Sequence, residues 1–138
     1  MPIDNFLYAY VAQEEEYDKG DTIIKEGSRG NWTYLILEGK VKVNKITAKG
    51  IVTIGTLLEG EVFGEMILWQ TGKSTRTASI VAESYVKVGI LDTNRLIEEY
   101  EAISPRLKSL LGSLINKLAD VTNQAVILAV ESNNKPPA

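Results

Sequence analysis

The sequence of 138 residues contains no cysteine and no histidine. Without cysteine, the chain forms no disulfide, thiolate-ligated zinc site, iron–sulfur cluster or cysteine nucleophile. Without histidine, it lacks the side chain that serves most often as general base, metal ligand or haem ligand. No loop carries the spacing of Asp, Asn and Gly that a calcium site requires. We therefore expect no catalytic centre and no bound metal or cofactor, and an enzyme ranks last among the alternatives.

Long apolar runs and an excess of positive charge are also missing. The N-terminus has no basic stretch followed by an apolar run, and no segment approaches the ~20 apolar residues of a membrane span. With 15 basic against 18 acidic side chains, the formal net charge is -3, the wrong sign for a surface that neutralises a phosphate backbone. We expect a cytoplasmic protein that makes no direct contact with nucleic acid or membrane.

The length and the balance of apolar and charged residues fit one globular domain. Between Tyr17 and Leu91, short runs rich in β-branched and aromatic residues alternate with glycine-containing turns, which is typical of an all-β domain. Alternation of apolar and polar residues predicts strands with one buried and one solvated face. The predicted strands are 22–24, 33–37, 40–46, 51–57 and 85–91.

Beyond the last of these strands, apolar residues recur at the helical period of about 3.6 residues. Asp92 or Thr93 is a candidate cap for a short helix, and Ser104 followed by Pro105 is a start signal for a longer one. The final residues contain two prolines and are expected to be disordered. The predicted boundaries are 17–91 for the strands, 92–130 for the helices and 131–138 for the tail.

The longer helix carries an unbroken heptad repeat of apolar residues, at alternating spacings of four and three. We call this repeat the α-helical seam, and its members are Leu107, Leu111, Leu114, Leu118, Val121, Ala125 and Leu128. A helix from Pro105 to Leu128 is ~36 Å long, more than a domain of this size needs to cover its own sheet. Leu110 and Ile115 flank the seam and are expected to face the sheet. We predict a homodimer through the seam; the alternative is that the stripe packs within the chain.

The segment 63–79 interrupts the strand pattern and has the residues of a cradle for an anion. Gly64 allows backbone N–H groups to approach a phosphate, and Arg76 offers a planar fork to two phosphate oxygens. Glu65 repels a phosphate unless hydroxyl donors occupy it, and the 2′-hydroxyl of a ribose would fill that need. The alternative is an internal salt bridge between Glu65 and Arg76 in a domain that binds no ligand.

Phe63-Gly64-Glu65-Met66 followed by Arg76-Thr77-Ala78-Ser79 resembles the phosphate-binding cassette of cyclic-nucleotide-binding domains. Gly20-Asp21, Glu26-Gly27 and the stretch 34–41 resemble the turn-and-strand framework of that family, so the likeness covers about residues 17–128. The resemblance implies an eight-stranded β-roll of jelly-roll type, mainly β, with helices at its ends. It also implies that Glu65 binds the ribose 2′-hydroxyl and Arg76 the cyclic phosphate. The other ligand-binding residues that it implies are Gly64, Met66, Thr77 and Ala78.

Val121-Thr122-Asn123 falls where catabolite-activator-like regulators of bacteria have a Val-Thr-Ser step that contacts adenine across a dimer. Thr122, helped by Asn123, is therefore a candidate base contact that favours cyclic AMP over cyclic GMP. Thr77 resembles a position at which some members meet the guanine amino group, so it pulls weakly in the other direction. The alternative is that Thr122 simply faces solvent.

The sequence departs from the family pattern in and beyond the cassette. Ile67 replaces a small residue, Thr75 replaces the usual proline before the arginine, and Leu118 stands where regulators carry an arginine. The predicted function is a non-catalytic regulatory module that binds a cyclic nucleotide and signals through movement of its C-terminal helices, either free-standing or as a piece of a larger polypeptide. The alternative is a dimerisation or scaffold module of the same fold that binds no nucleotide.

Overall fold

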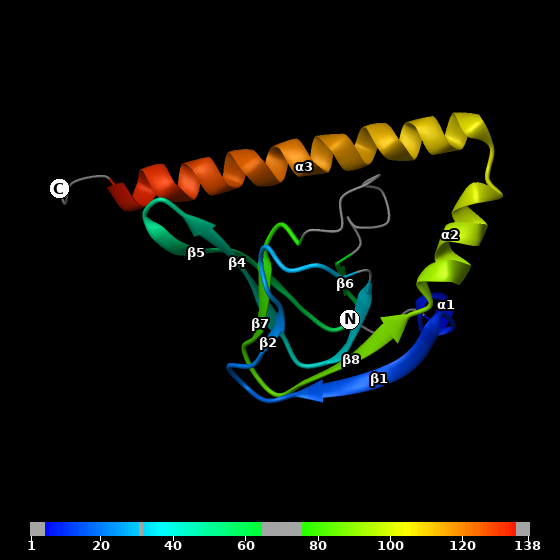
Figure 1. Cartoon of the computed structure of the whole chain (residues 1–138), viewed down its shortest axis with the longest axis horizontal. Helices are drawn as coiled ribbons and strands as arrows, with labels where there is room; N and C mark the ends of the chain where they lie inside the picture. The colour runs from blue at the N-terminus through cyan, green and yellow to red at the C-terminus, as the bar shows by residue number, and fades with distance from the viewer. Residues whose placement is uncertain (1–4, 31, 65–75, 135–138) are drawn as a thin grey trace.

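The computed structural model describes residues 5–30, 32–64 and 76–134, in which eight strands form two four-stranded antiparallel sheets (Figure 1). In chain order the elements are α1 (Asn5–Tyr8), β1 (Val11–Tyr17), β2 (Thr22–Ile24), β3 (Tyr34–Glu38), β4 (Val41–Thr47), β5 (Gly50–Leu57), β6 (Val62–Phe63), β7 (Ser79–Ala82), β8 (Val86–Leu91), α2 (Thr93–Glu101) and α3 (Pro105–Asn134). One sheet has the strand order β1-β8-β3-β6 and the other β2-β7-β4-β5. This arrangement confirms the predicted β-roll.

The core lies where the two sheets turn alternate side chains toward each other. In β7, Ile80 and Ala82 are buried while Ser79 and Val81 are partly exposed, as the period of two requires. Val86, Val88 and Ile90 of β8 join the same core from the other sheet. Burying branched aliphatic side chains contributes about 1.5–3 kcal/mol each, so this double layer supplies most of the stability of the roll.

The five predicted strands are confirmed to within one residue at each end, but the roll begins at Val11 rather than at Tyr17. The strand β1 was not predicted because its sequence runs through four consecutive polar residues, from Gln13 to Glu16, that hide the alternation. As an edge strand, β1 pairs only with β8 and leaves most of its residues at the surface. The two-residue strand β6 is too short to leave a pattern of its own.

Both helical start signals are confirmed. The side chain of Asp92 accepts a hydrogen bond from the Arg95 N–H at 3.1 Å, and Ser104 Oγ accepts one from the Leu107 N–H at 3.2 Å. Pro105 is the first residue of α3, where its missing N–H costs nothing. The helix continues to Asn134 over 30 residues, ~45 Å at ~1.5 Å per residue, so the expected tail is wrong for 131–134; 135–138 lie outside the described residues.

The two C-terminal helices meet the roll at opposite ends (Figure 1). The guanidinium of Arg95 in α2 donates to the Ala9 carbonyl at 3.1 Å and lies 4.8 Å from the ring centroid of Tyr10, which fixes α2 to the start of β1. From there, α3 runs back along one side of the molecule and contacts β5. None of the described helices is long and apolar enough to cross a membrane.

Candidate functional site

The backbone of Arg76 is held by the turn that follows β2. The Arg76 N–H donates to the Ser28 carbonyl, and the Gly27 N–H donates to the Arg76 carbonyl, both at 2.8 Å. The turn is itself closed by a hydrogen bond from the Ser28 N–H to the Lys25 carbonyl at 3.1 Å. These paired bonds fix the backbone of Arg76 three residues before β7, a strand of the β2-β7-β4-β5 sheet.

The side chain of Arg76 points inward and is 6% exposed. One terminal nitrogen, Nη1, donates to the Gly64 carbonyl at 3.2 Å, and the other, Nη2, donates to the Trp32 carbonyl at 2.6 Å. Burying a cation is costly unless polar groups surround it, and the two carbonyl dipoles meet part of that need. They also fix the plane of the guanidinium, which is the group that binds a phosphate in two-pronged fashion.

Two glycines make room for this arginine. Gly64 has φ +81°, and a Cβ there would lie 2.8 Å from the Trp32 carbonyl oxygen and 2.9 Å from Arg76 Nη1. A Cβ at Gly30 would lie 3.2 Å from Arg76 Nη2. Glycine at position 64 is therefore required both by the backbone conformation and by the close approach of the guanidinium.

A cavity of about 560 Å³ opens beside the arginine, between β2, the turn after it and the start of β3. Besides two isoleucines and a glycine, the lining residues are three cationic, two hydroxyl-bearing aliphatic and two aromatic ones: Lys25, Arg29, Arg76, Thr22, Ser28, Trp32 and Tyr34. The described residues that line it include no carboxylate. In a chain of net charge -3, this local excess of positive charge favours an anionic ligand.

The aromatic wall of the cavity continues into the core. The rings of Trp32 and Tyr34 meet edge to face with centroids 6.4 Å apart, and Tyr34 stacks on Phe63 at 4.9 Å. Trp32 remains 48% exposed, whereas Tyr34 is 5% exposed. Burial raises the pKa of the Tyr34 hydroxyl, and the positive charge of Arg76 acts in the opposite direction. Tyr34 and Arg76 line the same cavity, so the charge of the arginine acts on the tyrosine hydroxyl.

The structure brings together two of the predicted site residues, Gly64 and Arg76. Thr77 is exposed and Ala78 partly buried, directly after the arginine. Glu65, Met66 and Ile67 lie outside the described residues, as do the side chains of Thr122 and Asn123 on α3. The proposed roles of these residues stay predictions.

Several residues that complete the site were not predicted as part of it. Trp32 contributes a carbonyl oxygen, as the predicted Gly64 also does, and no side-chain pattern reveals a backbone acceptor. Gly30 and Arg29 belong to a turn that the glycines predict, but the fold alone brings that turn against residue 76. The signal that was present in the sequence is a tryptophan three residues after Arg29, since aromatic and cationic groups together suit a nucleotide.

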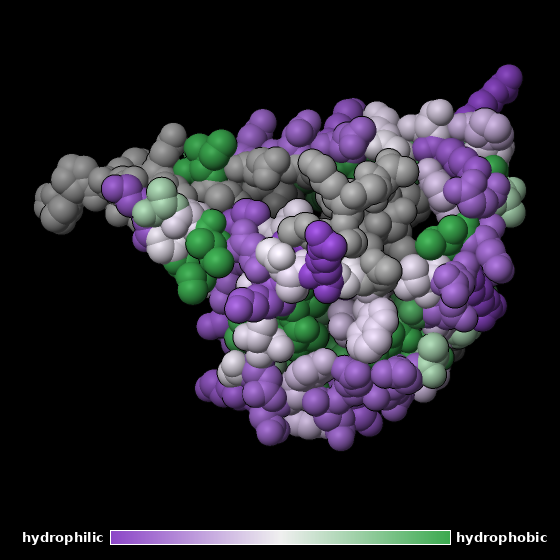
Figure 2. All heavy atoms as spheres, viewed as in Figure 1, coloured by the Kyte–Doolittle hydropathy of each residue, from purple (hydrophilic) through white to green (hydrophobic). Residues whose placement is uncertain are grey.

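The seam of α3 is largely at the surface. Leu107, Leu114, Leu118, Val121 and Leu128 are 43%, 51%, 54%, 60% and 64% exposed. Leu110 was expected to face the sheet but is 54% exposed, whereas Ile115 is partly buried. The expectation for Leu110 is wrong because α3 touches the roll over only part of its length, so its first turns have no sheet beneath them. Figure 2 shows apolar side chains interrupting a mostly polar surface along α3 and beside the β4–β5 hairpin.

Residues 14–102 match the cyclic nucleotide-binding domain family. The chain belongs to this family. The match spans the roll from within β1 to the end of α2 and includes Gly64 and Arg76, the two site residues that the fold brings into contact.

Among curated members of the cyclic nucleotide-binding domain family, the human cGMP-dependent protein kinase 2 is 35% identical over 106 residues, which are 72% of this chain and 14% of that protein. The cAMP-dependent protein kinase regulatory subunit of Mycosarcoma maydis is 30% identical over 120 residues, 86% of this chain and 22% of that protein. The chain thus spans less than a quarter of the length of these two relatives. Both names describe regulated kinases or their regulatory subunits.

Among solved structures, the cAMP-bound form of the EAL enzyme Bd1971 superposes with a TM-score of 0.71 at 27% identity, covering 83% of this chain and 31% of that one. The sensor domain of the transcriptional regulator DNR from Pseudomonas aeruginosa superposes with a TM-score of 0.66 at 19% identity, covering 85% of this chain and 77% of that one. The second likeness shows the fold alone. Together they place the same β-roll in enzymes and in transcriptional regulators.

Proposed function

We propose that this chain is a regulatory, non-catalytic module that binds a cyclic nucleotide in its β-roll. The observation that carries the proposal is the buried guanidinium of Arg76, held in plane by two carbonyls beside Gly64 and facing a cationic, aromatic cavity. A cyclic nucleotide combines one phosphate charge with a flat base, which matches those two properties of the cavity. Membership of the family and the names of the relatives support the same ligand class.

In this proposal Arg76 binds the cyclic phosphate through its planar fork, and Gly64 lets the backbone approach the same oxygens. Glu65 accepts a hydrogen bond from the ribose 2′-hydroxyl, while Met66, Thr77 and Ala78 line the pocket on either side. Arg76 exchanges one of its carbonyl contacts for the phosphate, so ligand binding is expected to shift the segment around Gly64. That shift is the first step of the signal.

Isothermal titration calorimetry of the purified chain with cyclic AMP and with cyclic GMP tests the proposal. We expect saturable 1:1 binding of at least one nucleotide, together with a rise in melting temperature, because a ligand that binds only the folded state stabilises it. If neither nucleotide produces heat or a thermal shift, the chain is a dimerisation or scaffold module of the same fold. The exposed seam of α3 would then be the surface through which it binds a partner.

We further propose that the chain forms a homodimer through α3 and that the C-terminal helices move when nucleotide binds. Support comes from the exposed seam, which repeats with the heptad spacing that suits a second copy of the same helix. The anchoring of α2 by Arg95, set against the lateral contact of α3 with β5, makes the short connection between the helices the natural hinge. The acidic net charge supports a role without direct nucleic-acid contact.

A preference for cyclic AMP over cyclic GMP is the finest part of the proposal. Thr122 is placed by the resemblance to accept from the adenine amino group, with Asn123 beside it, and a site bonded to one base leaves groups unpaired against the other at ~1–3 kcal/mol each. Competition titration of Thr122→Ala is expected to reduce the selectivity while leaving the fold intact. Equal binding of both nucleotides by the unaltered chain would show that α3 does not read the base.

A further inference from the structure

The segment that carries Arg76 is diverted away from the sheet that it enters. The strands β4 and β7 pair in register from Val41 opposite Ala82 as far as Asn44 opposite Ser79, where the ladder ends. Continued by one step, the same register would place Lys45 opposite Ala78. Instead, the backbone of Arg76 bonds to Gly27 and Ser28, so residues 76–78, which we call the arginine segment, leave β4 unpaired along that edge.

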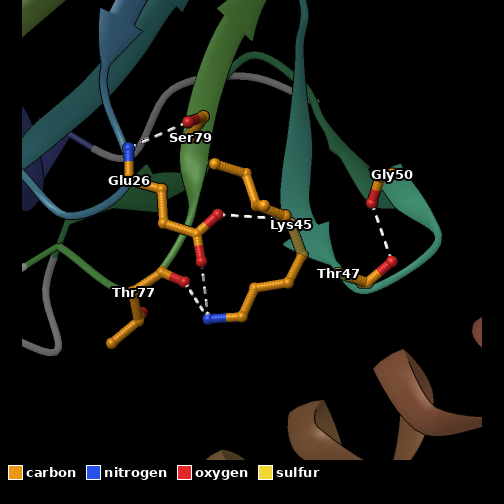
Figure 3. Close-up of polar contacts among 7 residues, drawn as sticks. Glu26, Lys45, Thr47, Gly50, Thr77 and Ser79 are labelled. Atoms are coloured by element: carbon orange, nitrogen blue, oxygen red, sulfur yellow. Dashed lines mark hydrogen bonds and ion pairs between the residues drawn. The ribbon is translucent and has the colours of Figure 1, made fainter.

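Two side chains fill the gap that this diversion leaves, as Figure 3 shows. One carboxylate oxygen of Glu26 accepts the Ile46 N–H at 2.7 Å, where a ladder bond to the neighbouring strand is absent. The other accepts from Lys45 Nζ at 3.0 Å. The same ammonium also donates to the Thr77 carbonyl, within the arginine segment. Finally, the Glu26 N–H donates to Ser79 Oγ at 2.8 Å.

This ion pair is better shielded than the others among the described residues. The side chains of Lys45 and Glu26 are 27% and 16% exposed, whereas those of Lys40 and Glu83 are 50% and 38% exposed and lie 4.0 Å apart. Exposed pairs contribute little because water and salt screen them, while partly buried pairs with additional hydrogen bonds are screened less. The Glu26–Lys45 pair is therefore able to hold a backbone segment in place.

We propose that Glu26 and Lys45 are positioning residues for Arg76. Neither residue lines the cavity, so both act through the arginine segment. The turn after β2 and the edge of β4 each hydrogen-bond to this segment, and the ion pair links the turn to the strand edge. Without the pair, the arginine segment loses the lysine bond at the Thr77 carbonyl and is free to continue the β4–β7 ladder, which would turn Arg76 away from the cavity. The inference deepens the proposed function and rests on it for its binding test.

The experiment compares Lys45→Met with Lys40→Met, two changes of the same kind that remove a shielded and an exposed ion pair, respectively. Loss of a charge-assisted hydrogen bond predicts that Lys45→Met weakens nucleotide binding roughly 5–20-fold, and Lys40→Met less than about twofold. Lys45→Arg, which keeps the charge and a donor, should recover most of the affinity. Equal affinity of Lys45→Met and the unaltered chain overturns the proposal.

Repeating Lys45→Met in a chain that also carries Arg76→Lys distinguishes a positioning role of Lys45 from direct contact with the ligand. If Lys45 acts through Arg76, then Lys45→Met should cost less than about twofold when added to Arg76→Lys, because the fork that it positions is already gone. The same loss in both backgrounds would show that Lys45 acts independently of the arginine and would also overturn the proposal. Should Lys45→Met fail to fold by circular dichroism, Glu26→Gln replaces it, since the amide oxygen can still accept the Ile46 N–H.

Amide hydrogen exchange provides a readout that needs no ligand. The N–H groups of Arg76 and Gly27 are the two that clamp the arginine segment, so both should exchange about tenfold faster in Lys45→Met than in Lys40→Met. Unchanged exchange at both positions overturns the positioning role. If the unaltered chain binds neither nucleotide, the proposed function fails on that result alone, and the exchange comparison still decides whether the ion pair positions the segment.

Discussion

The Arg76 end of the roll and the seam of α3 show opposite departures from the usual burial of side chains: a charged side chain is buried at the first, and apolar side chains are exposed at the second. At the first, a permanently charged side chain is 6% exposed; at the second, Leu128 is 64% exposed and Leu118 54%. Charged side chains are rarely buried to this extent, and large apolar side chains are more often buried than left to water. In the proposed function each feature serves binding, of a small anion at Arg76 and of an apolar partner helix at the seam.

The largest effect is expected from charging the seam. Leu111→Lys together with Leu118→Lys would bury like charges against their symmetry mates in the proposed dimer, at a cost on the order of 3–5 kcal/mol. Light scattering should report a dimer for the unaltered chain and a monomer for this variant. Ser109→Lys with Asn116→Lys has the same spacing at exposed positions off the seam, so it should stay dimeric. If the unaltered chain is monomeric at high micromolar concentration, the proposed dimer through the seam is wrong.

Replacing the buried cation tests the other region. Arg76→Ala removes a charge-assisted contact worth roughly 1.5–3 kcal/mol, so nucleotide affinity should fall by about one to two orders of magnitude. Arg76→Lys keeps the charge but loses the planar guanidinium, so its nucleotide affinity should lie between those of the unaltered chain and Arg76→Ala. Arg106→Ala, at an exposed position on α3, is the matched control and should bind as the unaltered chain does. Unchanged affinity in folded Arg76→Ala would place the phosphate elsewhere.

Two of the glycines at positive φ allow backbone strain to be distinguished from steric crowding at the site. Gly64 and Gly20 have φ +81° and +93°, but only a Cβ at Gly64 meets neighbouring atoms, whereas nothing lies within 4 Å at Gly20. Left-handed backbone costs roughly 1–2 kcal/mol for an alanine, so urea unfolding should show that loss for both Gly→Ala variants and a larger loss for Gly64→Ala. Only Gly64→Ala should also weaken nucleotide binding. Equal stability losses would mean that Arg76 moves aside without difficulty.

The same contrast explains how far the sequence could predict this molecule. Strands with clean alternation, such as β8, and helices with a cap, such as Asp92 at α2, were predicted closely because the signal is local. The strand β1 was not, since an edge strand with little to bury has no need of alternating residues. The tail was predicted too early because proline and polar composition describe its end, while the helix extends through 131–134.

For the site, the sequence supplied residue types but not their neighbours. Arg76 and Gly64 were predicted because the charge and the missing Cβ are visible in the sequence. The Trp32 carbonyl and the Glu26–Lys45 pair were not, because they reach the arginine segment through pairings that depend on where the β4–β7 ladder stops. That stop is a property of the whole sheet. Residues that position a site are accordingly harder to predict than residues that contact its ligand.

The smallest effect expected concerns the hydroxyl of Tyr34, a residue that lines the cavity beside Arg76 and stacks on Phe63 in the core. Burial raises its pKa above the ordinary value near 10, so at higher pH the unfolded chain loses this proton before the folded chain does. Because the unfolded state then binds fewer protons, the stabilising contribution is fully present below pH about 10 and is lost as the pH rises through the folded pKa. Tyr34→Phe should therefore lose less stability than the unaltered chain above that pH.

Removing the arginine links this titration to the comparison of the two regions. The charge of Arg76 opposes the rise in the Tyr34 pKa, so Arg76→Ala should raise that pKa further, whereas the seam variant should leave it unchanged. Ultraviolet titration of tyrosinate measures the difference, with Tyr34→Phe in each background to isolate one tyrosine from the six in the chain. A Tyr34 pKa that is the same with and without Arg76 would mean that the guanidinium does not face the cavity in solution. The buried cation would then have no bearing on an anionic ligand.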